Sequence, residues 1–435
     1  MSGKHPVILL LLVLAAIVAG KEVTIISAGP NAPDTRYLSR NAAALQQVPL
    51  DGVATWIASP VPIRDETGTL VTTRLDSGRL CRLPTGEDGA DVGQTIVPYS
   101  LGRWRPTHEI PPEHIAPAIA DLGAVEFDRF DSNFIHCLLG NGGHAMNWFD
   151  DELWRIICHN IGAIAKVAKQ GGCRGILIDP QAYSYSMWSY PILTETSGRT
   201  FTYRRGNKAY YEGRTFAEVE ATVRQRGREF AVAVNAEFAD PTVMFFRAAG
   251  LAALQLDDPR WDSIEQTDFG LILPFLDGML EGSTDETIIV DCNNQGLWTA
   301  RAELEQARNL VLTEGLARSQ VPALYKKKIR VGFCYRLGYH PQEYEIEGRG
   351  RSGTSTLYDP ALPKTNFFSP DRLEKTLKLA LDIGDGYVLF YNTRACWWLD
   401  SIEARPAADA PMNKSNRWVP QAYWQTLDKA RRAFD

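Results

Sequence analysis

The sequence has few of the patterns that identify a nucleic-acid binder, a coiled coil or a repeat protein. Its 46 basic and 52 acidic residues leave a formal net charge of −6, so no excess of Lys and Arg is available to neutralise phosphates. It contains no heptad pattern, short internal repeat or low-complexity tract, which disfavours coiled coils and solenoids. The chain has 435 residues and 45% hydrophobic content, which is enough for one large core or for two domains.

Metal-binding signatures are also missing. The seven cysteines include no CxxC pair, and the histidines show neither HxH nor HExxH spacing. We therefore expect no zinc site and no cofactor. The odd number of cysteines, several of them inside apolar segments, predicts at most one disulfide, because a free cysteine in a core behaves as a small apolar residue.

One long apolar run occurs, at the N-terminus, where lysines flank Val7–Ala19. The run is short for a membrane-spanning helix, which needs about 20 residues. Small residues ending at Gly20 resemble a signal-peptidase site. We expect residues 1–20 to be a signal peptide and 21–435 to be a single secreted or periplasmic domain with no stable membrane insertion. An uncleaved membrane anchor is the alternative.

Short apolar segments alternate with amphipathic helical segments along the rest of the chain. This alternation predicts a parallel sheet, and eight such units predict a (β/α)₈ TIM barrel with long insertions after strands two, four, seven and eight. An open doubly wound sheet is less favoured, because "SAGPNAPDT" after the first strand has no GxGxxG pattern. The expected strands lie at 23–27, 52–59, 132–140, 175–178, 242–250, 287–292, 329–336 and 387–392.

One segment, "FAVAVNAEF", could be a strand that ends on a catalytic glutamate, Glu237. Its apolar residues instead recur every three or four positions, from Phe216 to Phe238, which is the helical period. Thr215 and Glu218 fit a capping box at the start of that helix. We therefore predict a helix over 215–238 and no catalytic role for Glu237.

Two expected strands, the fourth and the sixth, end on aspartates: "GILID" on Asp179 and "IIVD" on Asp291. Strand ends meet at the C-terminal mouth of a (β/α)₈ barrel, where active sites lie. A pair of carboxyl groups is what glycoside hydrolysis requires, one ionised and one protonated. Asp179 is the predicted nucleophile or charge stabiliser and Asp291 the predicted acid/base. The alternative for either residue is a structural cap of a turn or helix.

Aromatic and polar side chains are frequent in the segments that follow the predicted strands. Aromatic faces pack against the apolar faces of sugar rings, and a carbohydrate is the expected partner, with no nucleic acid. The alternative for these rings is packing against the barrel. The predicted substrate-binding residues are Tyr183, His144, Asn293, Asn294, Arg336, His340, Asn392, Arg394, Trp397 and Trp398.

The segments "PLDGVATWI", "RGILIDPQAY", "FLDGML", "IIVDCNN" and "YVLFYNTRACWW" together resemble secreted bacterial glycoside-hydrolase-like (β/α)₈ proteins over nearly the whole mature chain. The pattern of the large clan of retaining β-glycosidases, Asn-Glu after strand four and Glu after strand seven, is absent. In the clan that contains the α-galactosidases, an Asp after strand four is the nucleophile and an Asp after strand six the acid/base. Asp179 and Asp291 are similar in placement.

The sequence therefore predicts an exported glycoside hydrolase. Two alternatives remain open at this point. The amide-rich mouth is compatible with a carbohydrate-binding barrel that has no catalytic activity. A metal-dependent hydrolase would require His144, His340, Asp179 and Asp291 to meet around a cation.

Overall fold

The structure is a computed structural model, and most of the predicted barrel is described in it. The described residues are 21–29, 32–58, 109–139, 147–180, 187–190, 211, 213–257, 261–293, 298–338, 358–391, 395–397 and 417–434.

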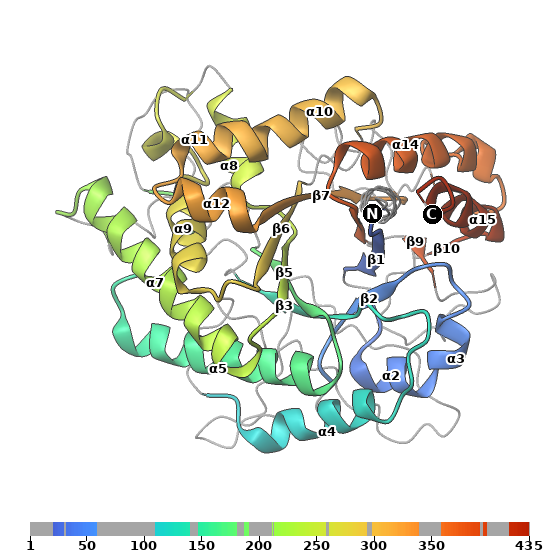
Figure 1. Ribbon diagram of the computed structural model, residues 1–435, viewed down its shortest axis with the longest axis horizontal. Coiled ribbons are helices and arrows are strands. Elements are labelled where there is room, and N and C mark those ends of the chain that lie inside the picture. The colour runs from blue at the N-terminus through green and yellow to red at the C-terminus, as the bar shows by residue number, and fades with distance from the viewer. Residues whose placement is uncertain are drawn as a thin grey trace, which may run out of the picture.

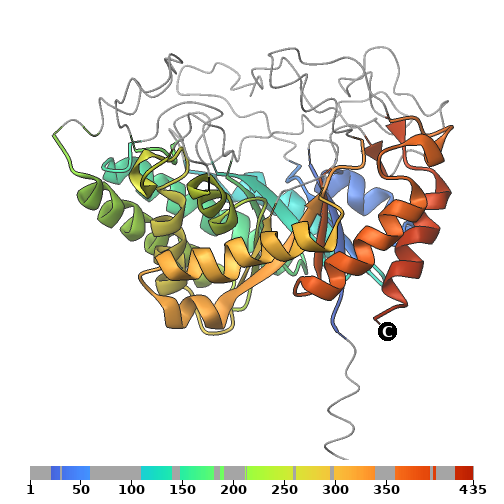
Figure 2. The same ribbon diagram turned by 90° about the horizontal axis from the view of Figure 1, so that it is seen from above.

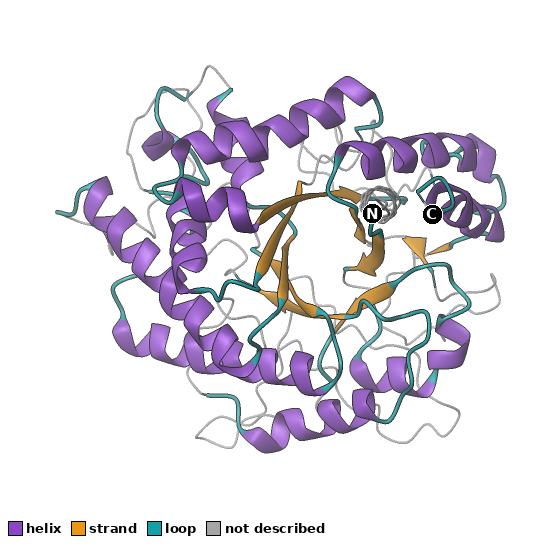
Figure 3. Cartoon of the chain, viewed as in Figure 1, coloured by secondary structure: helices purple, strands orange, loops and turns teal. Residues whose placement is uncertain are grey.

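Eight parallel strands form a closed barrel in chain order, with β8 paired to β1. The end-on views in Figures 1 and 3 show this ring of strands inside a ring of helices. All eight predicted strands are present, so the prediction of a (β/α)₈ barrel is confirmed. The strands are β1 (Thr24–Ala28), β2 (Gly52–Thr55), β3 (Phe134–Leu138), β4 (Gly175–Asp179), β5 (Thr242–Phe245), β6 (Ile288–Asn293), β7 (Ile329–Tyr335) and β8 (Tyr387–Tyr391).

The helices pack along the outside of the strands, as the perpendicular view in Figure 2 shows. A short parallel pair, β9 (Ala395–Cys396) and β10 (Arg417–Trp418), lies outside the barrel sheet. The described α-helices are α2 (Thr35–Arg40), α3 (Ala42–Leu45), α4 (Pro112–Gly123), α5 (Asp151–Gln170), α7 (Phe216–Glu237), α8 (Ala249–Leu256), α9 (Ile272–Gly282), α10 (Arg301–Asn309), α11 (Leu316–Arg318), α12 (Pro322–Lys328), α14 (Pro370–Ile383) and α15 (Gln421–Arg431). A π-helical turn, Leu310–Gly315, joins α10 to α11.

The predicted helix over 215–238 is confirmed as α7, and its capping box is complete. The Thr215 hydroxyl accepts the backbone N–H of Glu218, while the Glu218 carboxylate accepts the backbone N–H of Thr215. Glu237 is exposed at the last position of this helix, which leads into the first residue of β5. It therefore lies toward the N-terminal end of the barrel, opposite the mouth.

One helix was not expected. The sequence predicts a fifth strand over 242–250, but that strand ends at Phe245 and α8 begins at Ala249. Ala and Leu dominate the "AGLAALQL" of α8, and both residues have high helix propensity. This unexpected helix turns out to decide the role of Asp291.

Side chains of the barrel strands alternate between two buried layers, as expected for strands covered on both faces. The inner layer fills the barrel and includes Ile26, Ala28, Ala54, Phe134, Leu177, Met244, Phe246, Val290, Cys292, Cys334 and Leu389. The outer layer packs against the helices and includes Ile25, Val53, Ile135, Ile176, Ile178, Val243, Phe245, Ile289, Val331, Phe333, Val388 and Phe390.

The six cysteines that the structure describes are all free. Five are buried, two of them, Cys292 and Cys334, inside the barrel. Burial raises the pKa of these thiols well above the usual range. Among the described residues there is no helix long and apolar enough to cross a membrane.

Candidate active site at the barrel mouth

Asp179 is the last residue of β4, and its side chain points into the barrel. Leu177, two residues earlier, belongs to the inner layer, so the alternation along a strand places Asp179 on the same face. The side chain is only 4% exposed. The Tyr391 hydroxyl, at the end of β8 on the opposite side of the ring, donates a hydrogen bond to Asp179 Oδ2 at 3.2 Å. The structure therefore places Asp179 at the mouth, as predicted.

Two further strands contribute rings and cations to the same mouth. Phe246 directly follows β5, and its ring centroid lies 4.2 Å from that of Tyr391. The guanidinium carbon of Arg336, which directly follows β7, lies 5.6 Å from the Phe246 ring centroid and 5.5 Å from that of Tyr391. The guanidinium carbon of Arg247 lies 5.5 Å from the Phe246 centroid. The predicted residue Arg336 thus lies close to the Asp179–Tyr391 pair.

A histidine that sequence reasoning missed lies in the inner layer. His136 alternates with Phe134 on β3, and its ring stacks on Trp56 with centroids 3.9 Å apart. Burial lowers the pKa of His136 to about 3, so its imidazole is neutral near pH 7. Neither ring nitrogen has a hydrogen-bond partner. The Trp56 Nε1–H donates to the carbonyl of Gly29, which holds the stacked pair at this side of the barrel.

Asp291 faces the helix layer and Asp179 the inside of the barrel, so the structure does not bring the two predicted carboxylates together. Its neighbours Val290 and Cys292 belong to the inner layer, and alternation turns Asp291 outward. The carboxylate accepts the backbone N–H groups of Ala248 (3.2 Å) and Gly250 (2.9 Å) at the start of α8. Asp291, on β6, therefore caps the start of α8, the helix that follows the neighbouring strand β5. This is the structural cap that the sequence left open as an alternative.

Burial dominates the electrostatics of Asp291, which is 1% exposed. It raises the pKa of this carboxyl to about 6, although the N–H groups of Gly250 and Ala248 act in the opposite direction. A raised pKa is also typical of the acid/base residue of a hydrolase. The Asp291 carboxyl, however, faces the helix layer and not the inside of the barrel, so its proton does not point toward the mouth. The proposed cation site of His144, His340, Asp179 and Asp291 loses one ligand for the same reason.

Two predicted substrate-binding residues also face the helix layer. Asn293 donates from Nδ2 to the carbonyl of Ala307 in α10 at 3.1 Å and is buried. Trp397, expected to be an exposed sugar platform, is 1% exposed and packs on Phe390 of the outer layer with ring centroids 5.3 Å apart. Apolar packing outside the barrel, rather than sugar binding, explains this tryptophan.

Several aromatic residues of the mouth segments, where described, also pack rather than line a pocket. Trp188 is fully buried against Trp148 and Phe275, and its Nε1–H donates to the carbonyl of Pro180. The indole of Trp148 donates to the carbonyl of Met187. The predicted residues Tyr183, His144, Asn294, His340, Asn392, Arg394 and Trp398 lie outside the described residues.

Of the residues at the mouth, sequence reasoning identified Asp179 and Arg336 but missed Tyr391, Phe246, Arg247 and Trp56. It also missed His136, which lies deeper in the barrel, level with Leu177. The two-residue period of a strand was a signal that could have found Tyr391. Tyr391 shares a face with Leu389, as Asp179 does with Leu177. That period shows which residues of one strand lie together, but an apolar strand does not reveal which of its faces is inside.

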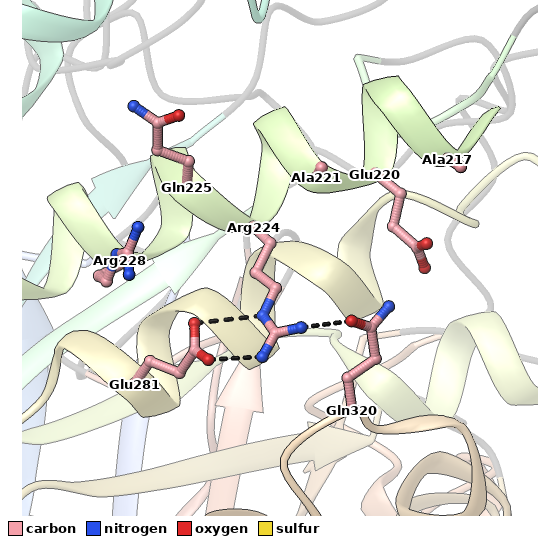
Figure 4. Close-up of a pocket in the computed structure, with 8 residues that line it drawn as sticks. All are labelled: Ala217, Glu220, Ala221, Arg224, Gln225, Arg228, Glu281 and Gln320. Carbon is pink, nitrogen blue, oxygen red and sulfur yellow. Dashed lines mark hydrogen bonds and ion pairs between the residues drawn. The ribbon is translucent and has the colours of Figure 1, made fainter. Parts of the chain in front are cut away.

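A separate groove of about 460 Å³ lies on the outer helices and not at the mouth (Figure 4). Arg224 of α7 reaches across it and hydrogen-bonds Glu281 of α9 and Gln320. This ion pair joins α7 to α9, so we assign these polar groove residues a structural role. The groove residues are Ala217, Glu220, Ala221, Arg224, Gln225, Arg228, Glu281 and Gln320.

No protein-family model and no curated protein matches the chain. Solved structures similar to it include a β-mannanase from the blue mussel Mytilus edulis, with 10% identity, coverage of 96% of this chain and 98% of that chain, and a TM-score of 0.40. A β-1,4-D-mannanase from Cryptopygus antarcticus has 10% identity, coverage of 95% and 90%, and a TM-score of 0.37. GH5_18 from Streptomyces cattleya in complex with GlcNAc has 11% identity, coverage of 96% and 81%, and a TM-score of 0.36. At these scores the likenesses transfer neither substrate nor residue roles, and the barrel rests on its own strand pairing.

Proposed function

We propose that this chain is a glycoside hydrolase whose reaction is centred on Asp179. The observation that carries the proposal is the hydrogen bond from Tyr391 to Asp179 at the C-terminal mouth of the barrel. That bond holds a nearly buried carboxylate in one orientation, at the end of the molecule where (β/α)₈ enzymes have their active sites. The Phe246 and Tyr391 rings pack against each other beside it, with centroids 4.2 Å apart.

The chemistry assigned to Asp179 is that of the ionised member of a glycosidase pair. Its carboxylate would stabilise the positive charge that develops at the anomeric carbon, or attack that carbon while the glycosidic C–O bond breaks. The leaving oxygen then takes a proton from an acid. Among the eight described strands the carboxyl groups are Asp179 and Asp291 alone, and Asp291 faces the helices. The acid would therefore come from a connection beyond the strand ends.

A second candidate is a carbohydrate-binding barrel without hydrolytic activity. The observation that favours it is the same one: the described strands direct a single carboxylate into the mouth. A binding site needs no second carboxyl group, because rings and hydrogen-bond donors suffice to hold a sugar.

The two candidates are separated by a matched pair of variants, Asp179→Asn and Asp291→Asn. Both replace a carboxylate at a strand end by its isosteric amide, on opposite faces of the barrel wall. We expect aryl-glycosides or polysaccharides to be cleaved by the wild type, and Asp179→Asn to lose about 10²-fold to 10⁴-fold in turnover while staying folded. Asp291→Asn, assayed below its unfolding temperature, should keep its turnover. Sugar binding by the wild type without any cleavage would support the binding barrel.

We also propose export, with cleavage after Gly20. Its support is the position of Lys21, whose ammonium group donates to the carbonyls of Leu381 (2.6 Å) and Asp382 (3.3 Å) at the end of α14. The neighbouring Glu22 forms an ion pair with Arg174. A cut at Gly20 would leave both of these anchoring residues in the mature chain.

A further inference from the structure

A side-chain hydrogen bond fixes the backbone directly after Asp179. Pro180, the next residue, has no backbone N–H, and its ring restricts Asp179 to extended conformations. The carbonyl of Pro180 accepts the indole N–H of Trp188, eight residues further along the chain, at 2.8 Å. On the strand side, the carbonyl of Asp179 accepts the backbone N–H of Leu139 at 2.8 Å. The backbone that carries the Asp179 side chain is therefore held at two successive carbonyl groups.

The Trp188 indole is itself held by the layer of helices. The ring is fully buried, and its centroid lies 5.7 Å from that of Trp148 and 5.4 Å from that of Phe275 in α9. The carbonyl of Trp188 accepts the backbone N–H of Leu271 at 2.9 Å. The Trp148 indole donates to the carbonyl of Met187 at 3.1 Å. Because closely packed interior side chains have little room to shift, the indole is a rigid point of attachment.

A buried cation joins the same cluster to a second helix. Arg226 of α7 is 5% exposed and donates from Nε to the carbonyl of Trp148 at 3.0 Å. Its terminal nitrogens form ion pairs with Asp151 and Glu229, which compensate the buried charge. Contacts with α7 and α9 thus hold the pair of tryptophans that borders Pro180.

The orientation of Asp179 is sensitive to small movements of this backbone. The hydrogen bond that it accepts from the Tyr391 hydroxyl measures 3.2 Å, which is already long for an O–H···O bond of about 2.5–3.0 Å. A reacting group that is misplaced by about 1 Å can lose about 10²-fold in rate.

We propose that Trp188 is a positioning residue of the mouth. Its indole N–H, acting through the carbonyl of Pro180, keeps the Asp179 carboxylate within reach of the Tyr391 hydroxyl and of the substrate. This inference rests on the proposed function, since it concerns the carboxylate on which that function is centred.

The test removes the indole N–H in two ways. Trp188→Phe keeps an aromatic ring of smaller size, whereas replacing Trp188 by benzothienylalanine keeps the bicyclic ring and exchanges only the N–H for sulfur. In both variants we expect kcat on the cleaved glycoside to fall about 10-fold to 100-fold, with KM changed by less than about threefold. Crystal structures should show the Asp179 carboxylate turned away from the Tyr391 hydroxyl. The benzothienylalanine variant decides the result if Trp188→Phe does not fold.

Trp154 supplies a matched control in the same cluster. It is also fully buried, and its ring stacks on Trp148 with centroids 4.9 Å apart. Its indole nitrogen, unlike that of Trp188, has no hydrogen-bond partner within the described part of the chain. Trp154→Phe therefore removes the same atoms from the same packing without removing a hydrogen bond. It should lower the unfolding temperature, as Trp188→Phe does, but leave kcat and the contact between Tyr391 and Asp179 unchanged.

The outcomes separate this inference from the proposed function. If the folded Trp188 variants keep kcat and the contact between Tyr391 and Asp179, or if Trp154→Phe loses as much kcat, the positioning role is wrong and the hydrolase proposal stands. If the wild type cleaves no glycoside, the hydrolase proposal fails and the crystal structures decide the positioning role by themselves. A displaced Asp179 in the Trp188 variants, but not in Trp154→Phe, then supports that role, and an unmoved Asp179 overturns it.

Discussion

Replacing Asp291 should lower the stability of the fold without touching the chemistry of the mouth. Its carboxylate is the acceptor for two buried N–H groups at the start of α8. In Asp291→Ala both donors lose that acceptor, and each unsatisfied buried group costs about 1–3 kcal/mol. We expect the free energy of unfolding to fall by about 2–4 kcal/mol at pH 5.

The same carboxyl predicts a pH dependence. Its pKa is about 6 in the folded chain and close to 3.9 when unfolded, so between these values the folded state holds more proton. The contribution of Asp291 to stability is therefore full below about pH 4 and is lost as the pH rises through 6, a change of about 3 kcal/mol. Burial also raises the pKa of Asp51 to about 6. The pH dependence of wild-type stability therefore contains the titrations of both residues, and a variant is needed to separate them.

The assay is urea denaturation from pH 4.5 to 7.5 for the wild type and for Asp291→Asn. The difference between the two unfolding free energies isolates the titration of Asp291, because Asp51 is common to both. We expect the variant to lack only the part of the fall in stability that Asp291 contributes, and to keep the part that comes from Asp51. Equal pH slopes in the two proteins would refute the buried titration. A folded, stable Asp291→Ala without activity would refute the structural role itself.

Three further predictions concern other residues. Trp397→Ala should lower the unfolding free energy by about 3–5 kcal/mol, since a large buried ring is removed, with sugar affinity unchanged in the molecules that remain folded; the reverse result in calorimetry and titration would restore the sugar platform. Glu237→Gln should keep full activity and an unchanged unfolding temperature in a kinetic and thermal assay, because Glu237 is exposed at the end of α7. Intact-mass analysis of exported protein should give a chain that begins at Lys21, and a mass that includes Met1 would contradict cleavage.

The eight strands could be predicted from the sequence because each is a short apolar run bounded by turns and followed by a helical segment. The helix over 215–238 was equally legible, since its three-and-four spacing and capping residues are local features. The predicted fifth strand, 242–250, is too long: the strand ends at Phe245, and the Ala and Leu residues from Ala249 onward belong to α8.

The directions in which Asp179 and Asp291 face could not be predicted from the sequence, because their local contexts are nearly the same, "ILID" and "IIVD". Strands buried on both faces carry apolar residues at every position, so the sequence does not mark which face is inside. The pairing register decides it: Ile178 lies beside Phe245, and Phe245 beside Asp291, and both Ile178 and Phe245 belong to the outer layer. Asp291 is therefore level with Ile178, one residue before Asp179. Because side chains alternate along a strand, this difference of one residue turns Asp291 toward the helices and Asp179 toward the inside of the barrel.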